Sequence, residues 1–278
     1  MFLSIITVNF NNRIGLYETL KSVAHQTCLD YEHIIIDGGS TDGSVDVIKS
    51  MMDDSGYSSH VSFWCSEKDE GVYNAMNKGL LHVNGDYILF LNSGDYFIDS
   101  DKIQEIISLG ITEDIIYFDA LCMFEKGTVT MQYPDFITPS FFYGKRTLNH
   151  QNTLIKAELH KKRPFNELYR IVADMDFFFE EIIMKDCSTR HVNFPIVFYN
   201  GVDGLSSKKE NLNLRDAEMR NSVSSYLSGR FIRDLDYIYS LEEEIREYKY
   251  RWGGLLYRLK VILDKYSDIK KRILRTVA

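Results

Sequence analysis

The segment Ile34-Ile-Ile-Asp-Gly-Gly-Ser-Thr-Asp-Gly43 decides the fold class, because it joins a short apolar run to a glycine-rich turn. A helical spacing of apolar residues follows over residues 44–52, and we expect Asp42 or Ser44 to be the N-cap. A buried strand, a turn and a helix in this order form the repeating unit of a parallel α/β sheet.

The same alternation extends over the first hundred residues. We expect strands over residues 3–8, 33–36, 61–65 and 87–91, and helices over residues 14–26, 44–52 and 71–83. Crossovers between such strands are right-handed, and ligands bind at the carboxyl ends of the strands. Three polar segments are therefore expected at this edge: Thr7-Val-Asn9, Asp37-Gly-Gly-Ser-Thr-Asp42 and Asn92-Ser-Gly-Asp95.

The pattern becomes less regular after about residue 100. We expect a strand pair over residues 115–123 and 127–133, a helix with an acidic start over residues 171–185, and a strand over residues 192–199. Beyond Gly204 the chain is polar and then helical to its end.

The composition is that of a globular protein. The chain has 278 residues, 45% of them hydrophobic and 26% charged, with a net charge of −8. These values exclude a disordered chain and argue against a nucleic-acid binder. No signal-peptide pattern and no apolar run of about 18 residues occur, so we expect no transmembrane helix. The four cysteines are far apart, which is typical of reduced thiols in a cytosolic protein and indicates no zinc site.

Two carboxylates follow expected strands. Asp37 precedes a glycine-rich turn, where a carboxylate can bind a ribose or a base edge, although an ordinary strand-to-helix turn has the same pattern. Asp95 ends the segment Phe90-Leu-Asn-Ser-Gly-Asp95, where it can hold a hard divalent cation that bridges phosphates. The alternative for Asp95 is that it caps the next helix.

Asp174 and Asp176 lie in the expected first turn of a helix, where the helix dipole favours negative charge. One of them can instead be a general base that reaches a substrate hydroxyl, and only one, because residues i and i+2 point to different faces. The cluster Asn149-His-Gln-Asn-Thr153 precedes a strand-like segment over residues 154–156 and contains a lone histidine, which is more often structural than catalytic.

Taken together, these segments resemble the family 2 glycosyltransferases, whose fold is the GT-A fold. The resemblance covers roughly residues 2–205. The motifs that carry it are Ser4-Ile-Ile-Thr-Val-Asn-Phe-Asn11, Ile36-Asp-Gly-Gly-Ser-Thr-Asp-Gly43, Glu67-Lys-Asp-Glu-Gly-Val-Tyr-Asn-Ala-Met-Asn-Lys-Gly79, Gly85-Asp-Tyr-Ile-Leu-Phe-Leu-Asn-Ser-Gly-Asp95, His150-Gln151 and Ala173-Asp174. The implied fold is a mixed, mainly parallel α/β sheet flanked by helices.

The resemblance assigns a role to each matching position. It implies Asp174 as the catalytic base and Asp95 as the ligand of a divalent cation, Mg²⁺ or Mn²⁺. It implies nucleotide-sugar contacts at Thr7, Val8, Asn9, Asp37, Asp69, Gly71, Lys78, Asn92, Ser93 and Gly94. On the acceptor or diphosphate side it implies His150, Gln151, Gly204 and Ser206.

Three departures from the family pattern stand out. The usual Asp-x-Asp-Asp is Asn92-Ser-Gly-Asp95 here, which implies a weaker or more donor-dependent metal site. Ala173 stands where the family usually has Glu before the base, and Met76 replaces an Arg often found beside the donor. Neither the base nor the last metal ligand is lost, so we expect an active enzyme.

The implied activity is that of an inverting hexosyltransferase. The expected donor is a UDP-hexose or a UDP-N-acetylhexosamine, and the expected acceptor is a lipid-linked glycan of bacterial capsule, O-antigen or exopolysaccharide synthesis. The alternatives are a nucleotidyltransferase that makes the activated sugar, and an inactive nucleotide-binding scaffold. A nucleotidyltransferase needs a basic, glycine-rich phosphate loop near the first strand, and Asn9-Phe-Asn-Asn-Arg13 is a poor match.

The resemblance and the charge pattern divide the chain. We expect a catalytic domain over residues 1–205, with a nucleotide-binding half (1–100) and an acceptor-binding half (101–205), followed by a helical extension (206–278). Residues 249–278 carry a net charge of +7 and one narrow apolar stripe. This basic amphipathic helix is expected either on the anionic inner face of the plasma membrane or packed on the catalytic domain or a second subunit, in a cytoplasmic protein.

Overall fold

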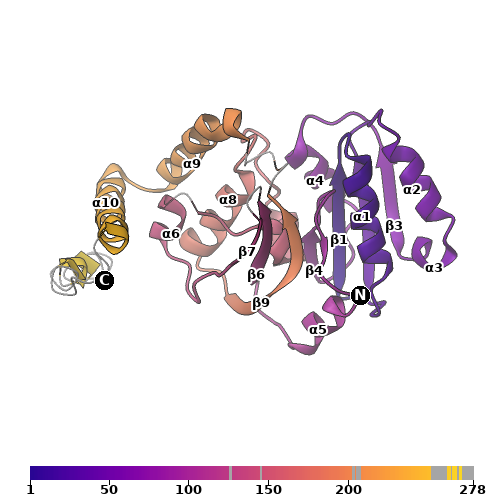
Figure 1. The fold of residues 1–278 in the computed structure, drawn as a ribbon, viewed down its shortest axis with the longest axis horizontal. Helices are drawn as coiled ribbons and strands as arrows, with labels where there is room; N and C mark the ends of the chain where they lie inside the picture. The colour runs from indigo at the N-terminus through magenta and orange to yellow at the C-terminus, as the bar shows by residue number, and fades with distance from the viewer. Residues whose placement is uncertain are drawn as a thin grey trace.

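The computed structural model describes residues 1–124, 127–144, 146–201, 204, 208–251, 262–263, 265–267 and 269–270, with only the backbone for residues 248–251. The N-terminal strands and helices lie at one end of the molecule and the long C-terminal helix α10 lies at the other (Figure 1). The N-terminal strands belong to one mixed sheet, and hydrophobic core residues lie on both of its faces.

Four parallel strands form the N-terminal part of this sheet. They are β1 (Leu3–Asn9), β2 (Tyr31–Asp37), β3 (Val61–Ser66) and β4 (Tyr87–Phe90), in the spatial order β3-β2-β1-β4. Helices α1 (Arg13–Ala24) and α2 (Ser44–Met52) cover one face, and α4 (Val72–Leu80) covers the other. Successive strand residues point to opposite faces, so Ile5 packs beneath α1 and α2 whereas Ile6 packs beneath α4.

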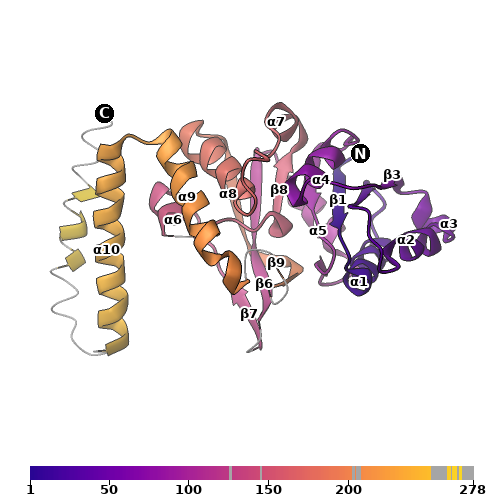
Figure 2. The same ribbon diagram turned by 90° about the horizontal axis from the view of Figure 1, so that it is seen from above.

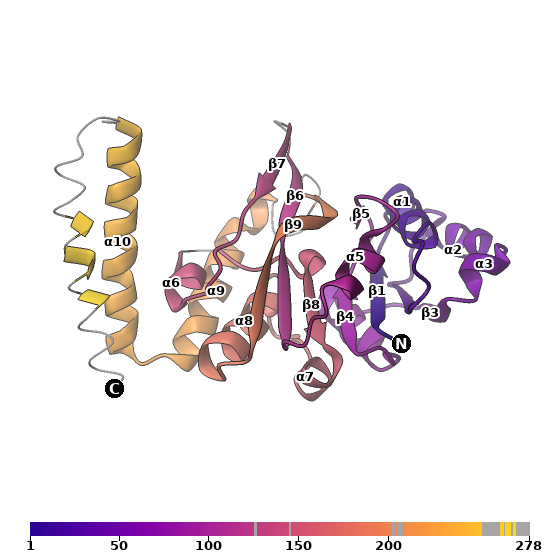
Figure 3. The same ribbon diagram turned by 90° about the horizontal axis from the view of Figure 1, so that it is seen from below.

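The second half of the sheet departs from the parallel pattern. β8 (Thr153–Lys156) is antiparallel to both β4 and β6 (Ile115–Phe124), and β9 (Thr189–Asn200) is parallel to β6. β5 (Tyr96–Phe97) closes this edge against β9. β7 (Gly127–Met131) forms the expected strand pair with β6, and this hairpin projects from the body (Figure 3).

The remaining helices connect or flank these strands. They are α3 (Ser55–Ser58), α5 (Lys102–Ser108), α6 (Pro139–Tyr143), η1 (His150–Asn152), α7 (Ala157–Lys162), α8 (Ala173–Phe178), η2 (Phe179–Met184), η3 (Lys209–Asn211), α9 (Leu212–Tyr226) and α10 (Gly229–Arg251). None of the helices in the described ranges is long and apolar enough to cross a bilayer.

Two local predictions are corrected by the structure. The helix expected over residues 171–185 is α8 followed by the wider π-helical turns of η2, because its second half uses longer-range backbone bonds. At the start of α2, neither Asp42 nor Ser44 is the N-cap. Gly43 takes that position with φ +91°, and the Asp42 carboxylate instead accepts hydrogen bonds from the Ser44 N–H and hydroxyl.

Helix α9 packs against α8 and η2 through a partly polar interface, and Figure 2 shows it beside α8. Met219 and Val223 enter the same hydrophobic cluster as the sheet. The Asp176 carboxylate of α8 accepts a hydrogen bond from the Ser222 hydroxyl at 2.6 Å, and its other oxygen lies 2.7 Å from Arg163 Nη2. Asp176 is therefore held by an ion pair with Arg163, at the end of α7, and by a hydrogen bond from α9.

The basic helix expected over residues 249–278 lies largely outside the described residues. The parts of it that are described are helical, with Ile262, Tyr266 and Ile269 of the apolar stripe half-buried. Burial raises the pKa of Tyr266, and the nearby charge of Glu242 in α10 raises it further. These observations favour packing of the stripe against α10, while Lys265 and Lys270 stay exposed.

We predict that Arg163→Met destabilises the protein by about 3–5 kcal/mol, because it leaves the buried Asp176 without its cation. Lys162→Met is the matched control: Lys162 is 76% exposed and pairs only loosely with Glu158, at 3.9 Å. It should change the unfolding free energy by at most about 1 kcal/mol. Urea unfolding followed by circular dichroism measures both, and equal losses in the two variants would contradict the prediction.

Candidate active site

The carboxyl ends of three neighbouring strands form one polar cluster. Asn9, Asp37 and Ser66 are paired across β1, β2 and β3, so their side chains meet at the same edge. The Asp37 carboxylate accepts hydrogen bonds from Asn9 Nδ2 at 2.6 Å and from the hydroxyls of Ser40 and Ser66, each at 2.6 Å. Burial alone raises the pKa of Asp37, but these bonds outweigh it and lower the pKa. Asp37 is thus a fixed, ionised acceptor.

The side chains of the first strand contribute unequally to this cluster. Asn9 Oδ1 is buried and has no hydrogen-bond partner among the described residues, so it is an acceptor available to a ligand donor. Thr7 is fully buried, and its hydroxyl donates to the Leu91 carbonyl at 2.8 Å and lies 2.8 Å from His33 Nε2. The Thr7 hydroxyl therefore bonds inside the fold, and the nucleotide contact implied at this position stays a prediction. Val8 is also buried, and its carbonyl accepts from Ser93 N.

Asp69 lies beside the same edge. Its carboxylate accepts a hydrogen bond from Gly71 N at 3.0 Å, and a Cβ added at Gly38 would collide with the other carboxylate oxygen. The absence of a side chain at Gly38 thus lets Asp69 approach the turn that follows Asp37. Gly71 takes φ +129° at the start of α4. Lys78 is engaged in an ion pair with Glu67 at 2.8 Å.

The segment after β4 brings Asp95 to the middle of the sheet edge. Gly94 takes φ +103°, and Asn12 Nδ2 donates to the Ser93 carbonyl at 2.9 Å, which ties this turn to the end of β1. Asp95 is 4% exposed, and one carboxylate oxygen accepts from Asn200 N at 2.9 Å. Burial raises the pKa of Asp95 to about 7. The hydrogen bond from Asn200 N lowers this pKa by less than burial raises it.

The donor set at Asp95 fits a divalent cation only if other ligands complete it. In the described part of the chain, no Lys or Arg pairs with Asp95 and no group of three His, Cys, Asp or Glu side chains could hold a metal. Asp95 has a second carboxylate oxygen, and Asn92 Oδ1 is a buried acceptor without a described partner. Hard cations accept such oxygens, with phosphate and water as further ligands.

The Asp174 carboxylate has three hydrogen-bond partners. The Tyr73 hydroxyl from α4 donates to Asp174 Oδ1 at 2.9 Å, and Met175 N donates to the same oxygen at 2.9 Å. His150 Nδ1 lies 2.9 Å from Asp174 Oδ2, while His150 Nε2 lies 3.0 Å from Asn92 Nδ2. Since the Asn92 amide nitrogen only donates, Nε2 accepts, and Nδ1 carries the hydrogen that His150 donates to Asp174.

This chain of contacts joins the segment after β4 to the helix that carries Asp174. The resemblance implied His150 on the acceptor or diphosphate side, and in the structure it contacts Asp174, the predicted base. Tyr73 was not predicted as a site residue, although it lies within the quoted segment from Glu67 to Gly79. A lone tyrosine on a helical face gives no signal that it reaches a carboxylate a hundred residues away.

The other predicted site residues have different outcomes. Gln151 is buried beside His150, and Gly204 is half-buried. Ser206 lies outside the described residues. Asp176, two residues after Asp174, faces Arg163 and Ser222 rather than His150, as expected for side chains that point to different faces.

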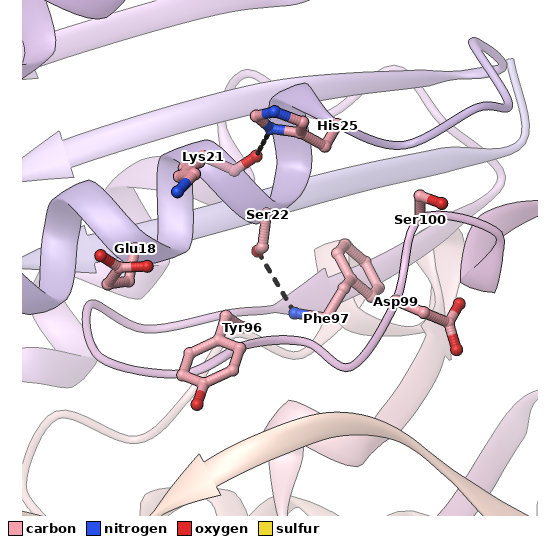
Figure 4. A pocket seen from close by; sticks show the side chains of 8 residues that line it. All are labelled: Glu18, Lys21, Ser22, His25, Tyr96, Phe97, Asp99 and Ser100. Carbon is pink, nitrogen blue, oxygen red and sulfur yellow. Dashed lines mark hydrogen bonds between the residues drawn. The ribbon is translucent and has the colours of Figure 1, made fainter.

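A separate hollow of about 210 Å³ lies between α1 and the segment around β5 (Figure 4). Its lining residues are Glu18, Lys21, Ser22, His25, Tyr96, Phe97, Asp99 and Ser100. None of the predicted site residues lines it. Within it, His25 Nδ1 lies 2.7 Å from the Lys21 carbonyl, and Phe97 N donates to the Ser22 hydroxyl at 3.2 Å.

Comparison with known proteins gives sequence relatives over most of the chain. The family model described as glycosyl transferase family 2 matches residues 4–167. The PGL/p-HBAD biosynthesis glycosyltransferase of Mycobacterium bovis (strain BCG / Pasteur 1173P2) is 30% identical over 213 residues, which are 73% of this chain and 78% of that protein.

Solved structures share the fold at lower identity. TarS 1-349 from S. aureus matches with a TM-score of 0.62 and 14% identity, over 92% of this chain and 74% of that one, and the chain spans 45% of a longer TarS chain. The mannosyltransferase PcManGT from Pyrobaculum calidifontis, solved with GDP-Man and Mn²⁺, matches with a TM-score of 0.56 and 15% identity, over 80% of this chain and 62% of that one. The expected GT-A fold is confirmed by these neighbours.

Proposed function

This chain belongs to glycosyl transferase family 2, and we propose that it moves a hexose or an N-acetylhexosamine from a UDP-sugar to a hydroxyl of a glycan acceptor, with inversion. It is a glycosyltransferase, which argues against both alternatives, the nucleotidyltransferase and the inactive scaffold. The observation that carries the proposal is the buried Asp174 carboxylate, bonded by Tyr73 and His150 and joined through Asn92 to the segment that ends in Asp95.

The strand-end cluster is the proposed nucleotide site. Asn9, Asp37 and Asp69 supply acceptors for the N–H of a uracil and the hydroxyls of a ribose, and the unpartnered Asn9 Oδ1 supports this assignment. Gly71, Lys78, Asn92, Ser93 and Gly94 stay in the proposal as residues that border the donor. TarS has been solved with UDP and with UDP-GlcNAc, which favours a uridine nucleotide over other donors.

The proposed halves of the catalytic domain follow from this arrangement. Residues 1–100 would bind the donor and residues 101–205 the acceptor, with Gln151, Gly204 and Ser206 on the diphosphate or acceptor side. Residues 206–278 form the helical extension in this division. Helix α9, which starts it, packs into the same hydrophobic cluster as the sheet.

In the proposed reaction Asp174 acts as the general base. Its carboxylate takes the proton of the acceptor hydroxyl while that oxygen attacks the anomeric carbon from the face opposite the nucleotide, and the bond to the diphosphate breaks. His150 and Tyr73 hold the carboxylate in position by hydrogen bonds. A divalent cation, Mg²⁺ or Mn²⁺, held by Asp95 and the donor phosphates would stabilise the charge of the leaving diphosphate.

A lipid-linked glycan of a bacterial surface polysaccharide is the proposed acceptor class. Support comes from the name of the mycobacterial relative, which describes PGL/p-HBAD biosynthesis. The basic tail is a second support, because a cationic segment favours anionic lipid surfaces on which such acceptors reside.

We predict that Asp174→Asn lowers the rate of UDP release by about 10²–10⁴-fold, the usual contribution of a general base. The substrate is the UDP-sugar that gives the largest thermal shift in a screen of UDP-glucose, UDP-galactose, UDP-GlcNAc and UDP-GalNAc. The same thermal shift should persist in the variant, because the nucleotide site is unchanged. Asp176→Asn is the control: it is less stable but keeps its turnover well below its melting temperature. Near-normal turnover of Asp174→Asn would remove the base assignment.

A second prediction concerns Asp95. Asp95→Ala should abolish the extra thermal shift that Mn²⁺ adds to the shift by UDP, because its carboxylate is the proposed protein ligand of the cation. The shift by UDP without metal should remain. Asp99→Ala, an exposed carboxylate on the following segment, should behave like the parent. Survival of the Mn²⁺-dependent shift in Asp95→Ala would count against Asp95 as the ligand.

Peripheral attachment of the tail to an anionic membrane is the third part of the proposal. Each basic residue near such a surface contributes about 1 kcal/mol. Replacing Lys270, Lys271, Arg272 and Arg275 by Gln in the full chain should therefore weaken cosedimentation with phosphatidylglycerol vesicles by more than about hundredfold. Phosphatidylcholine vesicles are the control, and unchanged binding of the variant to anionic vesicles would contradict attachment through this tail.

A further inference from the structure

We propose that Glu218 of helix α9 is a positioning residue for the catalytic base, so that the helical extension takes part in the reaction. This inference rests on the proposed role of Asp174. Helix α9 lies beyond residues 4–167, the range that the family model matches, and beyond the catalytic domain expected from the sequence. Its effect on the base follows from two hydrogen-bonded steps.

The first step joins α9 to the backbone before α8. Glu218 is 7% exposed, and its two carboxylate oxygens accept hydrogen bonds from Arg170 N and Ile171 N, each at 2.9 Å. Hydrogen bonds from backbone N–H groups to a carboxylate are about twice as strong as those between neutral groups. A buried carboxylate that spans two successive N–H groups thus fixes the conformation of the chain three to four residues before Asp174.

The second step joins this backbone to the base. The single hydrogen of the Tyr73 hydroxyl is shared between two acceptors, the Ile171 carbonyl at 2.7 Å and Asp174 Oδ1 at 2.9 Å. Ile171 is therefore held on its N–H by Glu218 and on its carbonyl by Tyr73. A shift of this residue moves the hydroxyl that orients the Asp174 carboxylate.

Helix α9 is well anchored for this task. One turn after Glu218, the Ser222 hydroxyl donates to Asp176 at 2.6 Å, and two turns after it the Tyr226 hydroxyl donates to Glu180 at 2.9 Å. In the described contacts neither residue bonds to the backbone of residues 170–171, although Ser222 also bonds to the side chain of Tyr169. They offer a control that weakens the docking of α9 without releasing the backbone before the base.

The test compares Glu218→Gln with Ser222→Ala. Gln keeps the size of the side chain but turns an N–H₂ group toward one of the two backbone N–H groups, so one bond and the charge are lost. We expect the kcat of UDP release to fall about tenfold to hundredfold, as for small misplacements of a catalytic group. The KM for the UDP-sugar should change less than about twofold, because the donor cluster is untouched. Ser222→Ala should lose stability but keep kcat.

A second variant separates positioning from folding. Tyr73→Phe removes the hydroxyl that carries the effect from Ile171 to Asp174 and leaves every bond of α9 in place. The double variant Glu218→Gln/Tyr73→Phe should be no slower than Tyr73→Phe alone, because both changes break the same chain of contacts. Multiplying losses in the double variant, or a kcat of Glu218→Gln within twofold of Ser222→Ala, would overturn the proposal.

Asp174→Asn, measured in the same assay, distinguishes failure of the proposed base from failure of the proposed role of Glu218. If Asp174→Asn releases UDP at the parental rate, the proposed base is wrong and the role of Glu218 falls with it. If Asp174→Asn is inactive while Glu218→Gln keeps its kcat, the base stands and Glu218 alone is refuted.

Discussion

A carboxylate cannot be buried without hydrogen bonds or a counter-charge, and this constraint shapes the molecule from the first strands to the C-terminal helices. Asp37 meets it with hydroxyl and amide donors, and Asp176 meets it with Arg163. Asp174 meets it with Tyr73 and His150, and Glu218 with two backbone N–H groups. Each solution ties together segments far apart in the sequence, so the polar groups of the site also organise the packing around it.

Asp95 differs from the others, and the difference is informative. It accepts hydrogen bonds from Asn200 N and from the Gln151 side chain, and burial still raises its pKa to about 7. A positively charged partner would favour the ionised form of such a carboxyl. If the proposed cation binds here, the donor phosphates would supply more of its ligands, because Asn92 and Gly94 stand where the usual motif has carboxylates.

The sequence predicted the parallel half of the fold well, because fully buried strands and glycine-rich turns alternate there at regular intervals. It indicated a strand over residues 154–156, which is β8, but not that this strand runs antiparallel to β4 and β6, since four residues carry no signal of pairing direction. In a strand buried on both faces, such as β1, polarity does not tell whether a side chain like that of Thr7 faces the ligand edge or the core. The contact of His150 with Asp174 depends on where β8 and α8 meet, which no local pattern encodes. Glu218 lies on the buried side of α9 with Ser222, so the core-facing side of that helix is partly polar and its role is invisible to hydrophobic spacing.

Helix α4 has a consequence for the whole reaction cycle. Its nine residues begin at Val72, directly after Gly71, whose N–H donates to Asp69, and its first turn carries Tyr73, which bonds to Asp174. A nucleotide that engages Asp69 and an acceptor that engages Asp174 would thus act on the same rigid body within one helical turn. Because coupling between two sites is reciprocal, each substrate would then change the affinity for the other by the same factor. This coupling would act through α4 itself, whichever substrate binds first.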